Sequence, residues 1–216
     1  KNPLAGLQIK IQTLYFQLIE NHPDLSHELK EEFELAYSEL KRIYNISKDF
    51  LKFSDLDKPQ LEEFPLQQIC ERCLENFHSF RNEHLAIDIR YGRDLPKHVF
   101  WDQRQIISLM NILVENAIDA LNGRGKILIE VNSSAQILKT KQPYIEIRIS
   151  DNGPGIPEQY RDKIFEPHFS TKQEGTGMGL VFAKHIVIQH GGKIDFFSAE
   201  NSGTVFVVPL PVTAVG

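Results

Sequence analysis

Apolar residues in the first fifty positions of the chain recur in alternating steps of three and four. One such seam runs from Leu4 to Leu18, and a second runs from Leu29 towards Phe50. This spacing places the apolar side chains on one stripe of an α-helix, as in coiled coils. The NHPD stretch at Asn21–Asp24 interrupts the pattern, because a residue before proline disfavours the helical conformation. The first third of the chain therefore predicts two antiparallel helices joined by a short turn.

The width of the apolar stripe predicts that this helical hairpin pairs with another copy. Leu35, Tyr44 and Leu51 lie beside the second seam and widen it beyond what one partner helix covers. We therefore expect a homodimer through a four-helix bundle. The second helix has room for about 30 residues and the first for only about 18, whereas antiparallel partners should be comparable in length. We expect part of the first helix to precede Lys1, so that the chain is a fragment of a longer protein.

The composition changes after Ser54–Gln60, a segment that we interpret as a linker because Pro59 interrupts regular secondary structure there. We assign residues 1–57 to the helical hairpin and residues 58–216 to a second domain. Periodicity in the second domain predicts helices over 66–80, 103–121 and 177–190, and strands over 85–91, 126–131, 144–150, 193–198 and 204–208. Runs of helix with mostly antiparallel strands favour an α+β fold, a two-layer sandwich, over a βαβ nucleotide fold.

Charge and hydropathy exclude several function classes. The 216 residues carry a net charge of −5, which gives no general basic field for nucleic acid. No apolar run approaches the roughly 18 to 20 residues of a membrane span. We therefore expect a cytoplasmic protein that meets a membrane only through parts of a longer parent chain.

The two cysteines, Cys70 and Cys73, form one CxxC pair that is compatible with half a zinc site or a redox pair. No second pair exists to complete a four-thiolate site. Both thiols fall on the apolar face of a helix that also carries Ile69 and Leu74, so a structural role in the core is favoured.

Two glycine clusters, DNGPG at Asp151–Gly155 and GTGMG at Gly175–Gly179, bracket a stretch rich in charged, proline and aromatic residues. Neither the P-loop pattern nor the dinucleotide fingerprint fits them. The second cluster enters a helix, where unpaired N–H groups and the helix dipole favour an anion such as a polyphosphate. The first follows a strand that ends at Asp151, whose carboxylate is a suitable acceptor for an exocyclic amine such as that of adenine. On a third segment, the amide oxygen of Asn116, together with phosphate oxygens and water, suits Mg²⁺.

Four segments resemble the conserved boxes of sensor histidine kinases and follow that family's order. NILVENAIDA resembles the N box, DNGPGIP the G1 box, IFEPHFSTK the F box and GTGMGL the G2 box. KNPL at the start resembles the end of an H box, and HGGKI follows the G2 helix. Each motif alone is weak, but four in order are specific. The resemblance implies the Bergerat ATP-binding fold, which is shared with DNA gyrase, a heat-shock chaperone and mismatch-repair ATPases.

The resemblance implies that the second domain binds ATP or ADP with Mg²⁺. DNGPG would hold adenine, GTGMG would hold phosphates, and residues 156–176 would form a mobile lid. Phe165 and Phe169 would anchor this lid, and Lys172 would reach the γ-phosphate. Asn116 would hold the metal and act in catalysis with Lys172. The implied nucleotide-binding residues are Asn116, Asp119, Asp151, Gly153, Gly155, Ile156, Phe165, Thr171, Lys172, Gly175, Thr176, Gly177, Met178, Gly179 and Leu180.

The helix that carries Asn116 favours a kinase over an ATPase. In the hydrolysing relatives, the water-activating glutamate lies four residues before the magnesium asparagine. That position here is Ile112, which cannot act as a base. Glu115 points about 100° away around the helix, and we interpret it as a solvated residue or a partner of the metal ligand, with a catalytic role left open. Asn111 stands one residue before the position where many histidine kinases carry asparagine, and we do not assign it to the metal.

An H box reads like HExKNP, so the resemblance places the phosphorylated histidine three positions before Lys1. SHELKEEF at His27 is similar to an H box, but it lacks the proline and begins the second helix. The resemblance also implies that Asn2 positions water for dephosphorylating the partner, a response-regulator receiver domain whose aspartate accepts the phosphoryl group. Three alternatives stay open: a nucleotide-binding pseudokinase that acts as a dimerisation scaffold, an ATPase of the same superfamily, and a serine kinase of this fold.

Overall fold

The structure, a computed structural model, describes residues 3–21, 27–54, 58–80, 83–134, 143–172 and 175–212. It consists of two compact units, Lys1–Asp55 with Pro167–Met178, and Leu56–Glu166 with Gly179–Gly216. Asn2, the predicted turn at 22–26 and positions 55–57 of the predicted linker lie outside the described residues. The domain boundary between residues 57 and 58 therefore stays a prediction.

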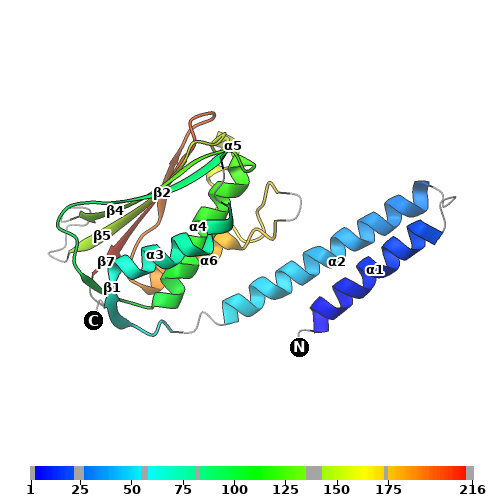
Figure 1. The fold of residues 1–216 in the computed structure, drawn as a ribbon, viewed down its shortest axis with the longest axis horizontal. Helices are drawn as coiled ribbons and strands as arrows, with labels where there is room; N and C mark the ends of the chain where they lie inside the picture. Colours follow the sequence, from blue (N-terminus) through cyan, green and yellow to red (C-terminus); the bar gives the residue numbers. More distant parts are fainter. Residues whose placement is uncertain are drawn as a thin grey trace. The chain divides into compact units, whose positions relative to one another are not determined.

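The two predicted N-terminal helices are confirmed as α1 (Pro3–Asn21) and α2 (His27–Ser54), which run antiparallel (Figure 1). Tyr15 makes the contact between them: its hydroxyl donates to Glu34 Oε1 at 2.9 Å, and its ring stacks on Tyr37 with centroids 6.4 Å apart. Leu14, a seam residue, is 62% exposed. The hairpin alone therefore leaves part of the apolar seam uncovered. Within the described residues, no helix has the length and apolarity that crossing a membrane requires.

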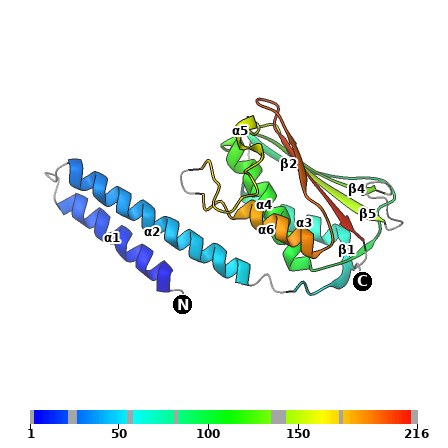
Figure 2. The ribbon, with the colours of Figure 1, turned by 180° about the vertical axis from the view of Figure 1, so that it is seen from behind.

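The second unit is built on a five-stranded sheet in the order β2-β4-β5-β7-β6, in which β2 and β4 are parallel and the other pairs are antiparallel. The strands are β2 (Leu85–Tyr91), β4 (Gly125–Ser134), β5 (Tyr144–Asp151), β6 (Asp195–Ser198) and β7 (Thr204–Pro211). Helices α3 (Leu66–Asn76), α4 (Gln103–Leu121) and α6 (Gly179–Gln189) cover one face of the sheet, as Figures 1 and 2 show. This arrangement confirms the predicted two-layer α+β sandwich.

Some element boundaries differ from the predictions, for local reasons. The helix predicted over 66–80 ends at Asn76 and is followed by the 3₁₀ turn η1 (His78–Phe80). Helix α6 begins at Gly179, because Gly177 has a φ of +69°, outside the helical range. The short strands β1 (Glu62–Pro65) and β3 (His98–Trp101) form a separate antiparallel pair that was not predicted. Helix α5 (Glu158–Arg161) lies inside the predicted lid.

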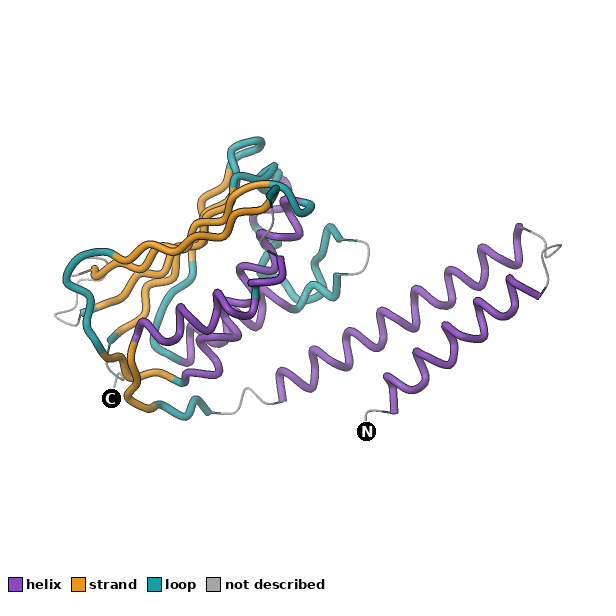
Figure 3. Tube along the Cα trace, viewed as in Figure 1, coloured by secondary structure: helices purple, strands orange, loops and turns teal. Residues whose placement is uncertain are grey.

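The core lies between the sheet and the three helices (Figure 3). Alternate residues of β5, namely Ile145, Ile147 and Ile149, are all buried, and so are their register partners on β7. Helix α4 contributes Leu109, Leu113 and Ala117, which are buried at spacings of four. The buried face of the strands, which repeats every two residues, and the buried face of α4, which repeats every 3.6 residues, therefore contribute to one apolar layer.

The CxxC pair is part of this core, as the helical periodicity predicted. Cys70 and Cys73 are free thiols with no exposed surface. Burial raises the pKa of Cys70 to about 11 and the pKa of Cys73 to about 12. Reactive cysteines are exposed thiolates with lowered pKa, so these two thiols pack as small apolar groups.

Candidate functional site

Asp151 stands at the end of β5, with its carboxylate partly tied to the backbone. Its Oδ1 accepts from the N–H of Gly153 at 2.8 Å and from the N–H of Thr204 at 3.3 Å. Burial raises the pKa of the Asp151 carboxyl, and these two N–H donors oppose the rise. Within the described part of the chain, the other oxygen, Oδ2, accepts no hydrogen bond. The arrangement leaves one oriented acceptor for a ligand donor.

The DNGPG loop is held by the turn between β6 and β7. Gly155 and Gly203 both have positive φ, and a Cβ on either would overlap a backbone carbonyl of the facing segment, at Ala199 or Asp151. The N–H of Ile156 donates to Ser198 Oγ at 2.8 Å. Sequence reasoning missed Ser198 and Gly203. Asn201-Ser202-Gly203 is recognisable as a turn, but nothing local shows which loop it supports.

One face of α4 brings three of the predicted segments together. A Cβ added to Gly153 would lie 3.6 Å from Ala120 Cβ, so the DNGPG loop lies over the end of this helix. A Cβ added to Gly179 would lie 3.5 Å from Ile112 Cγ2, so the start of α6 lies one turn before Asn116. Residues 112, 116 and 120 are spaced by four and share one helix face. Asn116 therefore lies between the DNGPG loop and the first residues of α6.

The position of Asn116 fits a magnesium ligand. Its side chain is half-buried on that face of α4, and a single neutral amide oxygen suits a cation that keeps water and phosphate as its other ligands. Among the described residues, no three histidine, cysteine, aspartate or glutamate side chains gather into a metal site. A metal held mainly by the nucleotide is thus compatible with the side chains present.

The other predicted residues of α4 differ in exposure and contacts. Glu115 and Asp119 are exposed. Asp119 follows Asn116 by three positions and Ile112 by seven, so it lies on the same helix face as these two residues. Asn111 Oδ1 accepts from Asn76 Nδ2 at 3.3 Å, so Asn111 faces α3. This contact supports leaving Asn111 out of the metal site. Nucleotide contacts by Asp119 and a catalytic role of Glu115 stay predictions.

Phe165 is packed against the sheet. Its ring meets Phe196 edge-on, with centroids 6.1 Å apart, and Lys184 Nζ lies 5.5 Å from its centre. The packing of Phe165 on an apolar surface agrees with the predicted lid anchor. Its contact with a nucleotide stays a prediction.

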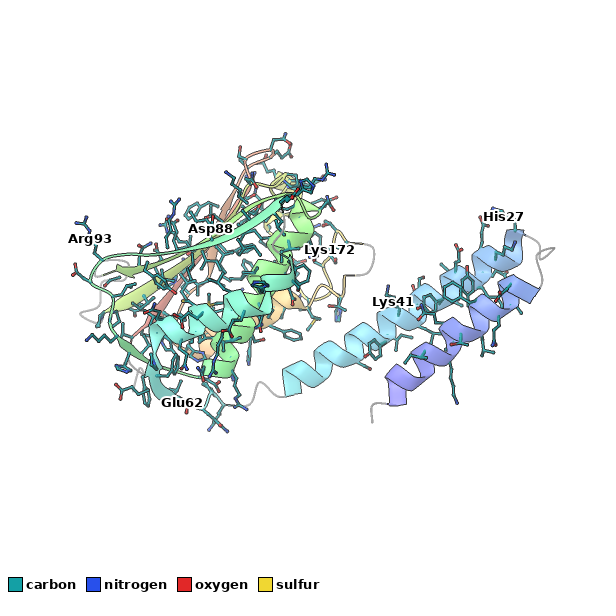
Figure 4. All side chains as sticks on the ribbon, viewed as in Figure 1. His27, Lys41, Glu62, Asp88, Arg93 and Lys172 are labelled. Atoms are coloured by element: carbon teal, nitrogen blue, oxygen red, sulfur yellow. The ribbon has the colours of Figure 1, made fainter. Side chains whose placement is uncertain are left out.

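The segment Pro167–Met178 contains the predicted residues from Thr171 to Met178 and is described by itself, whereas Leu180 lies in the first turn of α6. The Lys172 N–H donates to Ser170 Oγ at 3.1 Å, the Gly175 N–H donates to the Lys172 carbonyl at 3.2 Å, and the Met178 N–H donates to Thr176 Oγ1 at 3.4 Å. Lys172 is exposed on this loop (Figure 4). The approach of this segment to the nucleotide and its mobility as a lid stay predictions.

Gly177 is the position in this segment where a side chain is least tolerable. Its φ is +69°, and a Cβ there would overlap the backbone of His168 and Phe169. We expect Gly177→Ala to lower the affinity for ATP by roughly tenfold, equivalent to about 1.4 kcal/mol, because the loop must move off that backbone. Titration calorimetry measures this change. Gly123→Ala is the matched control, since Gly123 has a φ of +76° with nothing within 4 Å; equal losses in both variants would contradict the prediction.

A cavity of about 510 Å³ opens elsewhere on the second unit. It is lined by Arg161, the strand residues Phe196 to Ser198, and the turn that follows them. None of the residues predicted to bind nucleotide lines this cavity, but Ser198 and Gly203, which support the DNGPG loop, do.

Residues 101–214 match the sequence profile of the family described as histidine kinase-, DNA gyrase B-, and HSP90-like ATPase. The adaptive-response sensory kinase SasA of Gloeothece citriformis is 32% identical over 98% of this chain and 55% of its own length. The sensory histidine kinase/phosphatase NtrB of Rhodobacter capsulatus is 28% identical over 98% of this chain and 59% of its own. The chain thus spans a little over half the length of these curated relatives.

Solved structures show the same fold. The catalytic domain of histidine kinase ThkA is 31% identical, with a TM-score of 0.57 over 72% of this chain and 97% of that domain. A second ThkA structure, in complex with the response regulator protein TrrA, covers 98% of this chain and 60% of that one with a TM-score of 0.63 at 24% identity.

Proposed function

Because the chain belongs to the histidine kinase-, DNA gyrase B- and HSP90-like ATPase family, we propose that it is the core of a sensor histidine kinase. It binds Mg-ATP in the second unit and transfers the γ-phosphoryl group to a histidine of the helical hairpin. The observation that carries this proposal is the shared face of α4, on which Asn116 lies between the DNGPG loop and the start of α6. Adenine, metal and phosphate contacts are thereby available within one helix length.

The chemistry assigns one role to each segment. Asp151 accepts a hydrogen bond from the exocyclic amine of adenine, and the backbone near Gly179 offers helix N–H groups to phosphate oxygens. Asn116 contributes one oxygen ligand to Mg²⁺, which neutralises charge on the phosphates when bound. Lys172 approaches the γ-phosphate. A neutral imidazole nitrogen attacks the γ-phosphorus, the bond to the bridging oxygen breaks, and ADP leaves while the imidazole releases a proton.

Ile112 favours transfer to a side chain over hydrolysis. It occupies the helix turn before Asn116 and lies against the start of α6. An aliphatic side chain there cannot remove a proton from water. Position 112 therefore offers no general base for an attacking water, and a catalytic role of Glu115 stays a prediction.

Two kinds of partner are part of the proposal, and the exposed surface of the hairpin and the ThkA structure support them. Ile9, Leu14, Phe16, Leu35 and Ile43 are all more than half exposed on α1 and α2, and an apolar surface of this kind is typical of an interface. We propose that two copies pair through it as a four-helix bundle. ThkA has been solved with a response regulator, and we propose the same class of phosphoryl acceptor here. A cytoplasmic location is part of this proposal.

Labelled ATP tests the function. A longer chain that includes the H-box histidine expected three positions before Lys1 should incorporate label that is stable to alkali and lost in acid, whereas residues 1–216 alone should bind nucleotide and stay unlabelled. His27, labelled in Figure 4, lies at the start of α2, and its Nδ1 is 3.2 Å from Glu31 Oε1. Label on the 216-residue chain would make His27 the acceptor, and a longer chain that binds ATP without labelling would favour a scaffold.

Asn2 lies outside the described residues, and its role in dephosphorylation stays a prediction. In the longer chain, we expect Asn2→Ala to slow dephosphorylation of the phosphorylated partner while autophosphorylation keeps its rate, because only dephosphorylation needs a positioned water. Release of inorganic phosphate from the partner measures the first rate. An unchanged phosphatase rate would refute the role.

A further inference from the structure

Asp102 is a buried carboxylate that the proposed reaction does not use. It is 2% exposed and caps α4, its Oδ1 accepting from the N–H groups of Arg104 and Gln105 at 3.0 and 3.1 Å. Its Oδ2 accepts from the N–H of Gln60 at 2.8 Å. Gln60 belongs to the segment that leads into β1. One carboxylate therefore joins the start of α4 to the chain that precedes the second unit's first strand.

His190 ties the end of α6 to the same point. Its ring is 6% exposed, Nε2 accepts from the N–H of Asp102 at 3.0 Å, and Nδ1 donates to the Ile186 carbonyl at 2.8 Å. Only the neutral ring with its proton on Nδ1 makes both bonds. Burial lowers the pKa of His190, opposed by the Ile186 carbonyl and by the charge of Asp102. Asp102 is the charged group that faces the ring from α4, and Arg104 Nη2 lies 3.6 Å from its carboxylate.

This contact lies at the opposite end of the helix pair from the candidate site. Helices α4 and α6 run antiparallel: the end of α6 meets the start of α4 at Asp102, and the start of α6 meets α4 at Ile112, one turn before Asn116. Packed helices move as rigid elements with few discrete arrangements. A displacement at the Asp102 end must therefore change how Gly179 sits against Ile112.

We propose that Asp102 and His190 form a latch that sets the packing of α4 on α6 and couples the segment at Gln60 to nucleotide affinity, with His190 as a positioning residue. The latch rests on the proposed function of the site at the other end of the helices. It holds while the His190 ring is neutral. A protonated ring donates at both nitrogens and cannot accept from the Asp102 N–H, so acid opens the latch.

Three substitutions separate the two hydrogen bonds of the latch, from the Asp102 N–H to His190 Nε2 and from the Gln60 N–H to Asp102 Oδ2. His190→Gln places Oε1 near the position of Nε2 and keeps the acceptor without a titrating group. His190→Asn keeps a donor near Nδ1 but does not reach the Asp102 N–H. Asp102→Asn keeps a good cap for α4 but turns an amide NH₂ towards the Gln60 N–H, so that two donors face each other.

The test is titration of the 216-residue protein with MgADP between pH 5.5 and pH 8. We expect wild-type affinity to fall in the acid range more steeply than that of His190→Gln, whose profile records the nucleotide and every titratable group of the protein except His190. We expect His190→Asn and Asp102→Asn to bind roughly two- to tenfold more weakly at pH 8, the effect of one hydrogen bond. Identical profiles for wild type and His190→Gln would overturn the latch, and this comparison decides even if the other two variants fail to fold.

Amide hydrogen exchange of the nucleotide-free protein separates the latch from the proposed function. Exchange at the Asp102 N–H should speed up in His190→Asn, and exchange at the Gln60 N–H should speed up in Asp102→Asn. If these changes occur and wild-type protein binds no MgADP, the proposed function fails and the coupling fails with it, while the two hydrogen bonds stand. Unchanged exchange at both amides in folded variants would overturn the latch itself.

Discussion

Asp151→Asn lowers the affinity for ATP and ADP by roughly 10- to 100-fold, the effect of losing a hydrogen bond to a charged group. The reason is that three donors need acceptor oxygens at this position, and the carboxylate has two oxygens whereas the amide has one. Asp151 Oδ1 already accepts from the N–H groups of Gly153 and Thr204, and Oδ2 is left for the adenine amine. An amide has one acceptor oxygen, so whichever way it turns, its NH₂ faces another donor. Titration calorimetry with ADP measures the loss.

Base selectivity gives this prediction a second readout. Guanine has a carbonyl where adenine has the amine, so the wild-type protein should discriminate strongly against GTP, since a site built to accept a ligand donor rejects a ligand that lacks it. In Asp151→Asn the difference in affinity between ATP and GTP should be smaller than in the wild-type protein. Asp195→Asn is the matched control, because Asp195 is half exposed and pairs with Lys193 at 2.7 Å. ADP bound with wild-type affinity by folded Asp151→Asn would refute the adenine site.

Asn116→Ala removes the dependence of nucleotide binding on magnesium and, in the longer chain, slows autophosphorylation by about 10²- to 10³-fold, the range seen when one group that stabilises transition-state charge is lost. Asn116 lies on the α4 face between the DNGPG loop and the start of α6, where its amide oxygen can reach a metal on the phosphates. Titrations of Asn116→Ala with ADP should show that Mg²⁺ no longer increases the affinity. The affinity measured without Mg²⁺ should equal that of the wild-type protein.

Asn111→Ala is the control for the metal prediction. Asn111 is on the same helix and of the same residue type, but its side chain bonds to Asn76 on α3. We expect this variant to keep the wild-type response to magnesium. If Asn111→Ala abolished that response and Asn116→Ala kept it, the metal ligand would be Asn111 and the assignment from the α4 face would be wrong.

The sequence indicated the fold class through short-range patterns. The three-four seams predicted α1 and α2, and alternation predicted the strands around Ile87, Ile129 and Ile147, because side-chain period reports directly which face of an element is buried. Strands β1 and β3 were not predicted, since each has only four residues and they pair with each other across more than thirty positions and not as a hairpin. The contact of Tyr15 with α2 was not predicted either, because the spacing of apolar residues shows which side of a helix is apolar but not which residues of the partner helix cover it.

For the candidate site, the sequence motifs indicated which segments are involved, and the tertiary structure showed which of these segments lie close together. Asn116, Asp151 and the two glycine clusters were recognisable because each motif is contiguous. Ser198 and Gly203 were not, since their importance comes from supporting a loop some fifty residues earlier in the chain; Thr204, which donates to Asp151, is 53 positions away.

By itself, the sequence determined the helical hairpin, the α+β class and the family, because periodicity and contiguous motifs are properties of neighbouring residues. Only the tertiary structure decided which predicted segments meet on one face of α4, that Asn111 turns to α3, and that His190 meets Asp102 across 88 positions. Such pairings depend on how packed elements are juxtaposed, and no local pattern encodes the distance between two residues that the fold alone brings together.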